Sequence, residues 1–458
     1  MNGPLILIAV PTAAAILTLI LRPLRQIGVF IAVAALLVTA VWMLQAPLDE
    51  PQVILGRTIA LAGGDRLGIA LLYVITAAIL VSARLASPSW PYDPFALFVL
   101  SALSAALIYR PPLNEVYPTF VYSALFIAIA SALCAVTLHS ERPGGTSGAL
   151  RFLVFSTLAL PVLLLADWTL GQLSQSPDTP ELIQRTIGLI ALGFALLLAV
   201  FPFHSWAPGI AGEAPPPSTA IVLTVLFGAV WILLLDALYG NRLIATDPNV
   251  PELLKAAGLI MTASGGLLAW AQHDFGRLLG YAALVDTGAI LFAVGIRSDA
   301  GLAAAFMLVT GRVAGIGLMS VGLATARARA TDSSFAALRG LLWKLPWAAL
   351  AIIAGGLSLS GMPPLAGFPG RWGLAQQAAA IDPRAAAILL GAGASVAVGA
   401  LRGLREMLQP FDENETPISR ERLREIILIA VAVTLCLAFG LFPGLLAPIA
   451  RTFVVAFQ

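Results

Sequence analysis

Long apolar runs separated by short polar segments dominate the chain. About fourteen of them are long enough to cross a ~30 Å hydrocarbon core as helices. They lie near residues 3–21, 27–45, 66–86, 95–110, 117–138, 150–170, 182–203, 216–238, 252–272, 277–297, 300–323, 345–369, 385–408 and 425–445. The runs do not alternate apolar and polar residues with a period of two, as the strands of a membrane β-barrel do. The pattern therefore predicts an all-α polytopic membrane protein.

The composition agrees with this prediction and excludes several classes of protein. Of the 458 residues, 59% are hydrophobic and 11% are charged, and the net charge is only +2. A soluble domain carries about 25% charged residues, and a nucleic-acid-binding domain needs a basic patch. We therefore exclude a soluble enzyme, a disordered chain and a nucleic-acid-binding protein.

The metal-ligating residue types are few and scattered. Cys134 and Cys436 lie far apart in apolar runs, which excludes a disulfide scaffold and a cysteine-held iron–sulfur cluster. His139, His204 and His273 are too dispersed in the sequence to form a zinc site. We expect no metal site and no cofactor bound by this chain.

The charges between the runs predict an orientation. With an even number of spans, both termini lie on one side of the membrane. Lys and Arg are more numerous in the loops on the opposite side, which places the N-terminus outside the cytoplasm. The first run has no basic segment before it, so we interpret it as an uncleaved span. We expect a multi-pass protein of the cell inner (plasma) membrane.

Two proline clusters interrupt the apolar pattern. One is Pro215, Pro216 and Pro217 at the start of the run 216–238, and the other is Pro363 and Pro364 within the run 345–369. Proline removes a backbone hydrogen bond, and the freed groups are tolerated at membrane depth where they line a cavity. Interrupted helices in two halves of a chain are typical of inverted-repeat transporters, with the ion site at the breaks. The alternative is that the first cluster only marks the end of a loop.

Three motifs resemble a known family. Residues 201–208 (FPFHSWAP) and 212–220 (GEAPPPSTA) resemble the signature PFHxWLPDAHxEAPxPxSA. That signature belongs to the antiporter-like membrane subunits of respiratory complex I and to Mrp-type cation/proton antiporters. Residues 272–281 (QHDFGRLLGY) and 357–372 (LSLSGMPPLAGFPGRW) resemble two further motifs of this family, the second in the form most similar to the N-type subunit.

The resemblance covers about residues 95–410 and implies an organisation. It implies N-terminal transmembrane helices over 1–94, a core of two inverted five-helix repeats over 95–410, each with a proline-broken helix, and a connector and transmembrane helix over 411–458. It further implies that the chain works with other membrane and peripheral subunits of a complex I-like assembly. Those partners, and not this chain, would bind quinone and NADH or ferredoxin.

The resemblance also implies buried lysines and glutamates that relay ions along the membrane midplane, and most of these are missing here. Lys255 and Lys344 are the only lysines, and both lie near the ends of runs. The family's lysine positions fall on Leu197, Gly228 and Gly276, and the basic position of the second broken helix is Arg371. Lysine can release a proton when it is buried, whereas arginine stays charged.

The residues that remain define a candidate proton path: Glu213, His204, Asp286, Arg312 and Arg371. An ionisable residue within a span is expensive and suggests a functional site. Because Asp286 and Arg312 both lie in the middle of runs, we expect them to pair across neighbouring helices. Alternatively, this pair is purely structural, Glu213 is a loop charge, and His204 braces its loop.

Three functions remain open. The first is a membrane-arm subunit of a complex I-like NADH (or other donor):quinone oxidoreductase that contributes to proton translocation through a relay depleted of lysine. The second is a non-conducting spacer in the same complex. The third is a subunit of an Mrp-type cation/proton antiporter. The chain itself would carry no redox site in any of the three.

Overall fold

The structure is a computed structural model. It describes residues 3–46, 52–54, 57–59, 61, 63–108, 121–139, 146–173, 179–240, 242–330, 332–410 and 419–457. Almost all of this part of the chain is helical. The acidic residues Asp412, Glu413 and Glu415, in the connector expected at the start of 411–458, lie outside the described residues.

The helices follow the apolar runs along the chain. In the first half they are α1 (Gly3–Ile20), α2 (Arg25–Gln45), α3 (Gly63–Ala86), α4 (Asp93–Ile108), α5 (Val121–Thr137), α6 (Ser147–Leu173), α7 (Pro180–Leu197), α8 (Trp206–Glu213), α9 (Pro216–Ala220) and α10 (Phe227–Gly240). In the second half they are α11 (Arg242–Thr246), α12 (Asn249–Trp270), α13 (Phe275–Gly295), α14 (Asp299–Arg327), α15 (Leu341–Lys344), α16 (Pro346–Ser360), α17 (Gly367–Ile381), α18 (Pro383–Met407), α19 (Leu423–Leu441) and α20 (Ala447–Ala456).

Shorter elements complete the described chain. A π-helical segment, η3 (Ile221–Leu226), joins α9 to α10. The 3₁₀ turns are η1 (Arg22–Leu24), η2 (Phe203–Ser205) and η4 (Pro443–Leu445). The strands β1 (Gln52–Ile54) and β2 (Arg57–Ile59) form an antiparallel hairpin after α2.

The prediction of an all-α polytopic membrane protein is confirmed. In the described part of the chain, 11 helical segments are long and apolar enough to cross a membrane. They coincide with eleven of the predicted runs. The other three runs, near 95–110, 117–138 and 345–369, correspond to the shorter apolar helices α4, α5 and α16.

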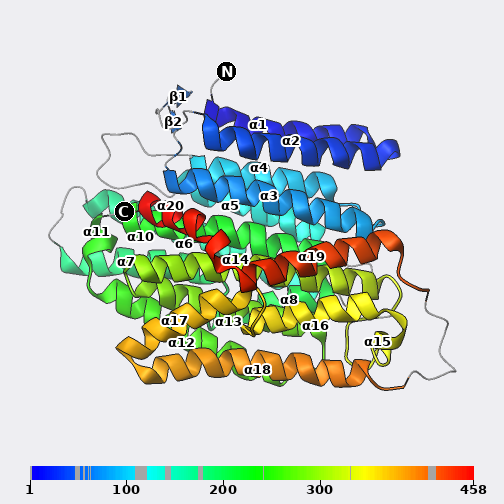
Figure 1. Ribbon diagram of the computed structural model, residues 1–458. Coiled ribbons are helices and arrows are strands. Elements are labelled where there is room, and N and C mark those ends of the chain that lie inside the picture. The colour runs from blue at the N-terminus through cyan, green and yellow to red at the C-terminus, as the bar shows by residue number, and fades with distance from the viewer. Residues whose placement is uncertain are drawn as a thin grey trace.

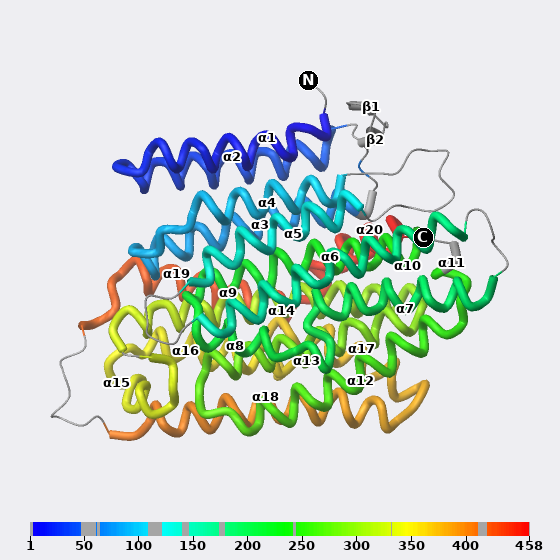
Figure 2. The backbone as a smooth tube through the Cα atoms, turned by 180° about the vertical axis from the view of Figure 1, so that it is seen from behind, coloured from blue at the N-terminus to red at the C-terminus, as the bar shows by residue number. Residues whose placement is uncertain are grey.

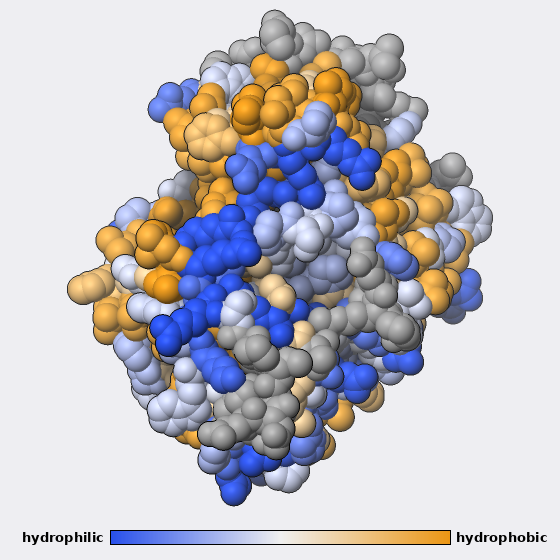
Figure 3. Space-filling model, turned by 90° about the vertical axis from the view of Figure 1, so that its right-hand side faces the viewer, coloured by the Kyte–Doolittle hydropathy of each residue, from blue (hydrophilic) through white to orange (hydrophobic). Residues whose placement is uncertain are grey.

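The long helices lie roughly parallel in stacked layers (Figures 1 and 2). The α1–α2 hairpin forms one edge, where α1 packs on α4 and α2 on α3, and α18 lies at the opposite edge. The segment Pro216–Gly240 and α13 are the most enclosed, since 94% of each apolar window is buried, against 33% or less for α6, α7 and α12. Hydrophilic residues gather across one end of the bundle, with hydrophobic side chains around them (Figure 3). This is the arrangement expected where helix ends reach water and helix sides face lipid.

The second predicted break is confirmed. Helix α16 ends at Ser360, where Gly361 takes a φ of +80° that glycine adopts without strain, and α17 begins at Gly367. Pro363 and Pro364 lie between the two helices. We refer to residues 361–366 as the second break.

The first break is not where the prolines predicted it. Helix α7 ends at Leu197 and α8 begins at Trp206, so residues 198–205, which we call the first break, interrupt the span. The chain also leaves the helix at Ala214 and Pro215, but there α8 ends beside the start of α6 and the end of α14. Pro215, Pro216 and Pro217 therefore mark the turn between α8 and α9 at one end of the bundle (Figure 2).

Candidate functional site

Helix α13 carries the centre of the site. The Asp274 side chain caps its start by accepting a hydrogen bond of 2.7 Å from the Arg277 N–H. Asp286 lies near the middle of the helix and is 3% exposed. The other buried carboxylates of the described chain, Asp65, Asp93 and Glu425, lie in the first turns of helices. Asp286 is therefore the one that lies deep between helix ends.

Asp286 faces the second break. Arg371, in the first turns of α17, donates from Nη2 to Asp286 Oδ1 and to the Leu359 carbonyl oxygen, the latter at 2.9 Å. Leu359 lies in the last turn of α16, whose carbonyl groups lose their helical partners at the break. Arg371 thus pairs with the carboxylate and also donates a hydrogen bond to a carbonyl oxygen left free at the end of α16.

Two glycines make room for the Arg371 side chain. A Cβ atom on Gly361 would lie 2.4 Å from Arg371 Cδ, and a Cβ atom on Gly393 of α18 would lie 3.3 Å from it. Any larger side chain at Gly361 would collide with the stem of Arg371. The second break and α18 are therefore shaped around the guanidinium.

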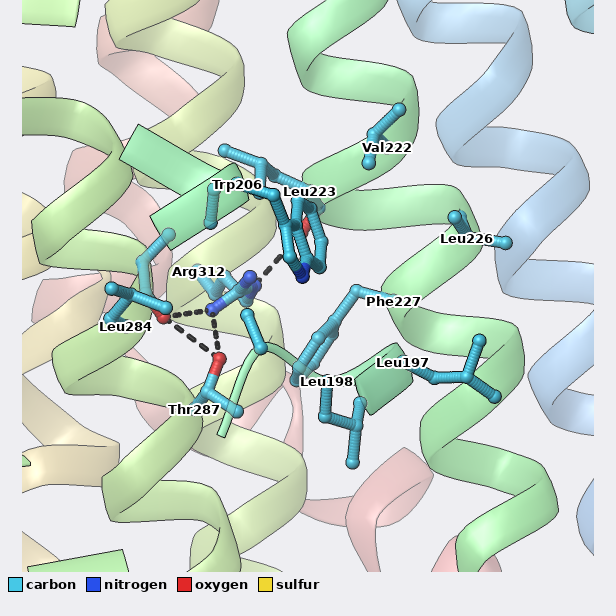
Figure 4. A pocket seen from close by; sticks show the side chains of 13 residues that line it. Leu197, Leu198, Trp206, Val222, Leu223, Leu226, Phe227, Leu284, Thr287 and Arg312 are labelled. Atoms are coloured by element: carbon cyan, nitrogen blue, oxygen red, sulfur yellow. Dashed lines mark hydrogen bonds between the residues drawn. The ribbon is translucent and has the colours of Figure 1, made fainter. Parts of the chain in front are cut away.

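Arg312 of α14 lies at the first break and has only neutral partners. Its Nε donates to the Leu223 carbonyl oxygen at 2.9 Å, and its Nη1 donates to the Ala283 carbonyl oxygen at 2.5 Å and to Thr287 Oγ1 at 3.1 Å (Figure 4). The Phe227 ring lies 3.9 Å from the guanidinium carbon, in cation–π contact. Leu223 belongs to the π-helical segment η3, so the irregular helix supplies one of the acceptors.

The predicted Asp286–Arg312 ion pair is therefore wrong, because Asp286 pairs with Arg371 instead. The reason is the helical period. Ala283 and Thr287 are four residues apart and share the face of α13 that meets Arg312. Asp286 is rotated by about 100° from Thr287 and faces α17.

Glu213 lies apart from these residues. It accepts hydrogen bonds of 2.8 Å from the Ser147 hydroxyl and from the Gly148 N–H, the first residues of α6. A carboxylate at the start of a helix accepts hydrogen bonds from free N–H groups and interacts favourably with the positive end of the helix dipole. Its contacts are those of a cap at the end of the bundle, which agrees with the loop-charge alternative.

His204 lies in η2 within the first break. Its ring stacks on Phe201, with ring centroids 5.2 Å apart and planes at 19°. The two residues after Ser205, Trp206 and Ala207, line a cavity together with Arg312. Leu197, the last residue of α7, and the first two residues of the break, Leu198 and Ala199, line it as well. The structure thus brings His204 to the break, but not into contact with Asp286 or Arg371.

Arg312 lies close to one of the positions where the family motifs imply a lysine. Leu197, on which one family lysine position falls, lines the same cavity as Arg312. A Cβ atom on Gly276, another such position, would lie 2.3 Å from the Ala211 carbonyl oxygen, which leaves no space for a side chain. The positive charge at the first break comes from α14 and not from α7.

Sequence reasoning missed two arginine clusters. Asp93, 1% exposed, accepts from Arg84 Nη2 at 2.5 Å and pairs with Arg25 at 3.0 Å. Arg327 donates to the carbonyl oxygens of Ala214 and Gly212 at 2.7 and 2.8 Å, which holds the end of α8. No spacing in the sequence indicates these contacts, because the partners lie on separate helices.

No metal centre is formed by the part of the chain that the structure describes. Within it, no group of three or more His, Cys, Asp or Glu side chains could hold an ion. The mid-bundle site offers one carboxylate and two guanidinium groups, which can hold and orient a proton or a small ion.

Known proteins resemble this chain in sequence and fold. Residues 149–396 match the family described as NADH:quinone oxidoreductase/Mrp antiporter, TM. NADH-quinone oxidoreductase subunit N 2 of Sorangium cellulosum is 29% identical over 251 residues, or 50% of this chain and 49% of that protein. NADH-quinone oxidoreductase subunit 14 of Thermus thermophilus is 29% identical over 77% of this chain and 84% of that protein. The match thus spans about half the length of the first of these relatives.

A solved structure shares the fold. A chain of the Mrp complex from Dietzia sp. matches with a TM-score of 0.86 at 16% identity, and the match covers 100% of this chain and 97% of that one. At this identity the likeness concerns the fold alone. The family match covers more than half of the chain, and it includes both broken helices and the residues Asp286, Arg312 and Arg371. The chain is an integral multi-pass membrane protein that belongs to the NADH:quinone oxidoreductase/Mrp antiporter family, with N-type subunits among its relatives.

Proposed function

We propose that this protein is a membrane-arm subunit of a complex I-like quinone oxidoreductase and contributes to proton translocation. Its partners would be other membrane and peripheral subunits, which bind the quinone and NADH or ferredoxin. The relatives named NADH-quinone oxidoreductase subunits support this assignment. We place it in the cell inner membrane with the N-terminus outside the cytoplasm, as the loop charges indicate.

One observation carries the proposal. Asp286 is a buried carboxylate in the middle of α13, it pairs with Arg371 at the second break, and its neighbour Thr287 contacts Arg312 at the first break. A carboxylate can bind and release a proton, whereas the two guanidinium groups stay charged. Asp286 is thus the exchangeable group, and the arginines set the electric field around it.

The contacts define what each residue does in a transfer step. A proton bound to Asp286 removes the negative charge that Arg371 faces and weakens their pair. Arg371 keeps its hydrogen bond to the Leu359 carbonyl oxygen, so it stays in place when the pair loosens. Release of the proton restores the pair. Water must carry the proton to and from Asp286, because the arginines do not exchange it.

A spacer without conduction is the second candidate. It is favoured by the hydrogen bonds of both arginines to backbone carbonyl oxygens of neighbouring helices, which would hold those helices together. It is also favoured by the position of Lys255. Its ammonium pairs with the exposed Glu252 at 2.7 Å, and its side chain lies beside Gly295 at the end of α13, not beside Asp286 in the middle of that helix.

The Asp286→Asn variant separates the two candidates. We would purify the assembled complex, reconstitute it into liposomes, and measure protons translocated per quinone reduced. The proposal expects a lower ratio with the complex intact. Glu252→Gln is the matched acid-to-amide control on the surface and should leave the ratio unchanged. An unchanged ratio in Asp286→Asn, in a complex of full subunit content, would refute conduction and support the spacer.

A further inference from the structure

A small cavity lies at the first break. Its walls come from the end of α7, the start of α8, η3, α13 and α14, and include Leu197, Trp206, Leu226, Phe227, Thr287 and Arg312. It has room for about one water molecule or one ion of similar size. Figure 4 shows the Trp206 indole, the Phe227 ring and the Arg312 side chain around this space.

Two of the hydrogen-bond donors at this cavity have no acceptor among the described residues. Trp206 is 4% exposed, and its Nε1–H has no hydrogen-bond partner. The hydrogen bonds of Arg312 use Nε and Nη1, which leaves Nη2 able to donate. Helix α8 begins at Trp206, so the positive end of its dipole is also at the cavity. A buried donor without an acceptor is costly, and here two donors and a helix start lie together.

Positive charge is in excess around this cavity. Arg312 has carbonyl groups, a hydroxyl and an aromatic ring as partners, and no carboxylate. Asp286, the buried acid of this region, is already paired with Arg371. The two arginines and one aspartate together carry a net charge of +1. In an environment of low polarity an uncompensated charge is strongly unfavourable.

We propose that the cavity binds a small monovalent anion of the size of chloride, held by Arg312 Nη2 and Trp206 Nε1 at the start of α8. The anion accepts hydrogen bonds from these donors and neutralises Arg312. The leucine and phenylalanine walls suit a weakly hydrated halide, and the small volume excludes sulfate and phosphate. This site does not depend on whether the chain conducts protons.

Halide-dependent stability tests the site. The purified full chain, in its complex, is transferred to sodium gluconate and titrated with NaCl or NaBr at constant ionic strength. We expect a saturable rise of a few degrees, about 2–4 °C, in the apparent melting temperature. Sodium sulfate, which is too large for the cavity, should behave like gluconate.

Two tryptophan variants make the test specific. Trp206→Phe keeps an aromatic ring and removes the donor, so the halide concentration at half-saturation should rise about tenfold, the effect of one lost hydrogen bond. Trp231→Phe is the matched control. Trp231 is also buried with an unpartnered Nε1–H, but it stacks on Phe453 and does not line the cavity. Equal half-saturation in the two variants would contradict the proposal.

A direct measurement covers the case in which Trp206→Phe does not fold. Crystals of the wild-type protein soaked in NaBr should give an anomalous peak between Arg312 and Trp206. Density for a water molecule without anomalous signal would overturn the proposal, as would a melting temperature that responds equally to chloride, sulfate and gluconate.

Discussion

Replacing Asp286 tests the mid-bundle ion pair most directly. The structure pairs this carboxylate with Arg371, with both side chains at most 5% exposed. Removing one partner of a buried ion pair leaves an uncompensated charge and costs about 3–5 kcal/mol. For a chain of 458 residues the unfolding entropy is about 1 kcal/mol per degree, so Asp286→Asn should lower the melting temperature by about 3–5 °C.

The identity of the partner can be determined with two double-mutant cycles. One combines Asp286→Asn with Arg371→Gln, and the other combines it with Arg312→Gln. Because the double variant of a contacting pair removes both charges, its loss should be smaller than the sum of the single losses, by about 1–3 kcal/mol for Arg371. For Arg312, whose bonds go to neutral groups, the deviation from additivity should be clearly smaller.

Differential scanning fluorimetry in detergent gives the melting temperatures of all five variants and the wild type. Chemical denaturation in bicelles gives an independent free energy of unfolding for each. The Asp286–Arg312 pair that the sequence favours predicts the reverse order of coupling. A larger coupling energy for Arg312 than for Arg371 would refute the arrangement described above.

Two further predictions concern the helix break and the loop before α19. Gly367→Ala should abolish the yield of folded protein, since its Cβ atom would lie 1.8 Å from the Ser358 carbonyl oxygen. Gly373→Ala is the control, because no atom lies within 4 Å of its Cβ position, and it should leave the yield of monodisperse protein after extraction unchanged. Equal yields of the two variants would contradict this packing. Burial raises the pKa of Glu421, which accepts a 2.6 Å hydrogen bond from the Ala348 N–H. A raised pKa in the folded state means that this residue's contribution to stability is present at low pH and lost as the pH rises through that pKa. Glu421→Gln removes this loss, so the variant's melting temperature should gain on the wild type between pH 4 and pH 7, and a constant difference would contradict it.

The sequence predicted the helices well because apolar run length decides what can span a bilayer. It also located the second break, since Gly361, Pro363 and Pro364 stand inside one apolar run. It placed the first break at Pro215 because three prolines are a stronger local signal than one. The signal for the true position was Pro202, near the end of the run 182–203, where the helix stops at Leu197.

Ion-pair partners were harder to predict for a physical reason. Hydrophobic spacing shows which residues share a helix face, but not which face of α13 meets α14 and which meets α17. A rotation of about 100° separates Asp286 from Thr287, and that step decides between Arg371 and Arg312. The contacts of Trp206 and the Arg84–Asp93 pair likewise depend on how separate helices pack against one another.

The depth of Asp286 limits how any proton can move through this core. With a rise of 1.5 Å per residue, Asp286 lies about 14–17 Å from either end of α13. A single hydrogen bond covers about 3 Å, so several water molecules are needed on each side of the carboxylate. The buried lysines that the family motifs imply, and that this chain lacks, would shorten those water chains, but Arg312 and Arg371 cannot exchange protons in this way. Ordered water reaching Asp286 from both faces of the assembled complex is therefore a requirement of the conducting function, and a dry path on either side is sufficient to make the chain a spacer.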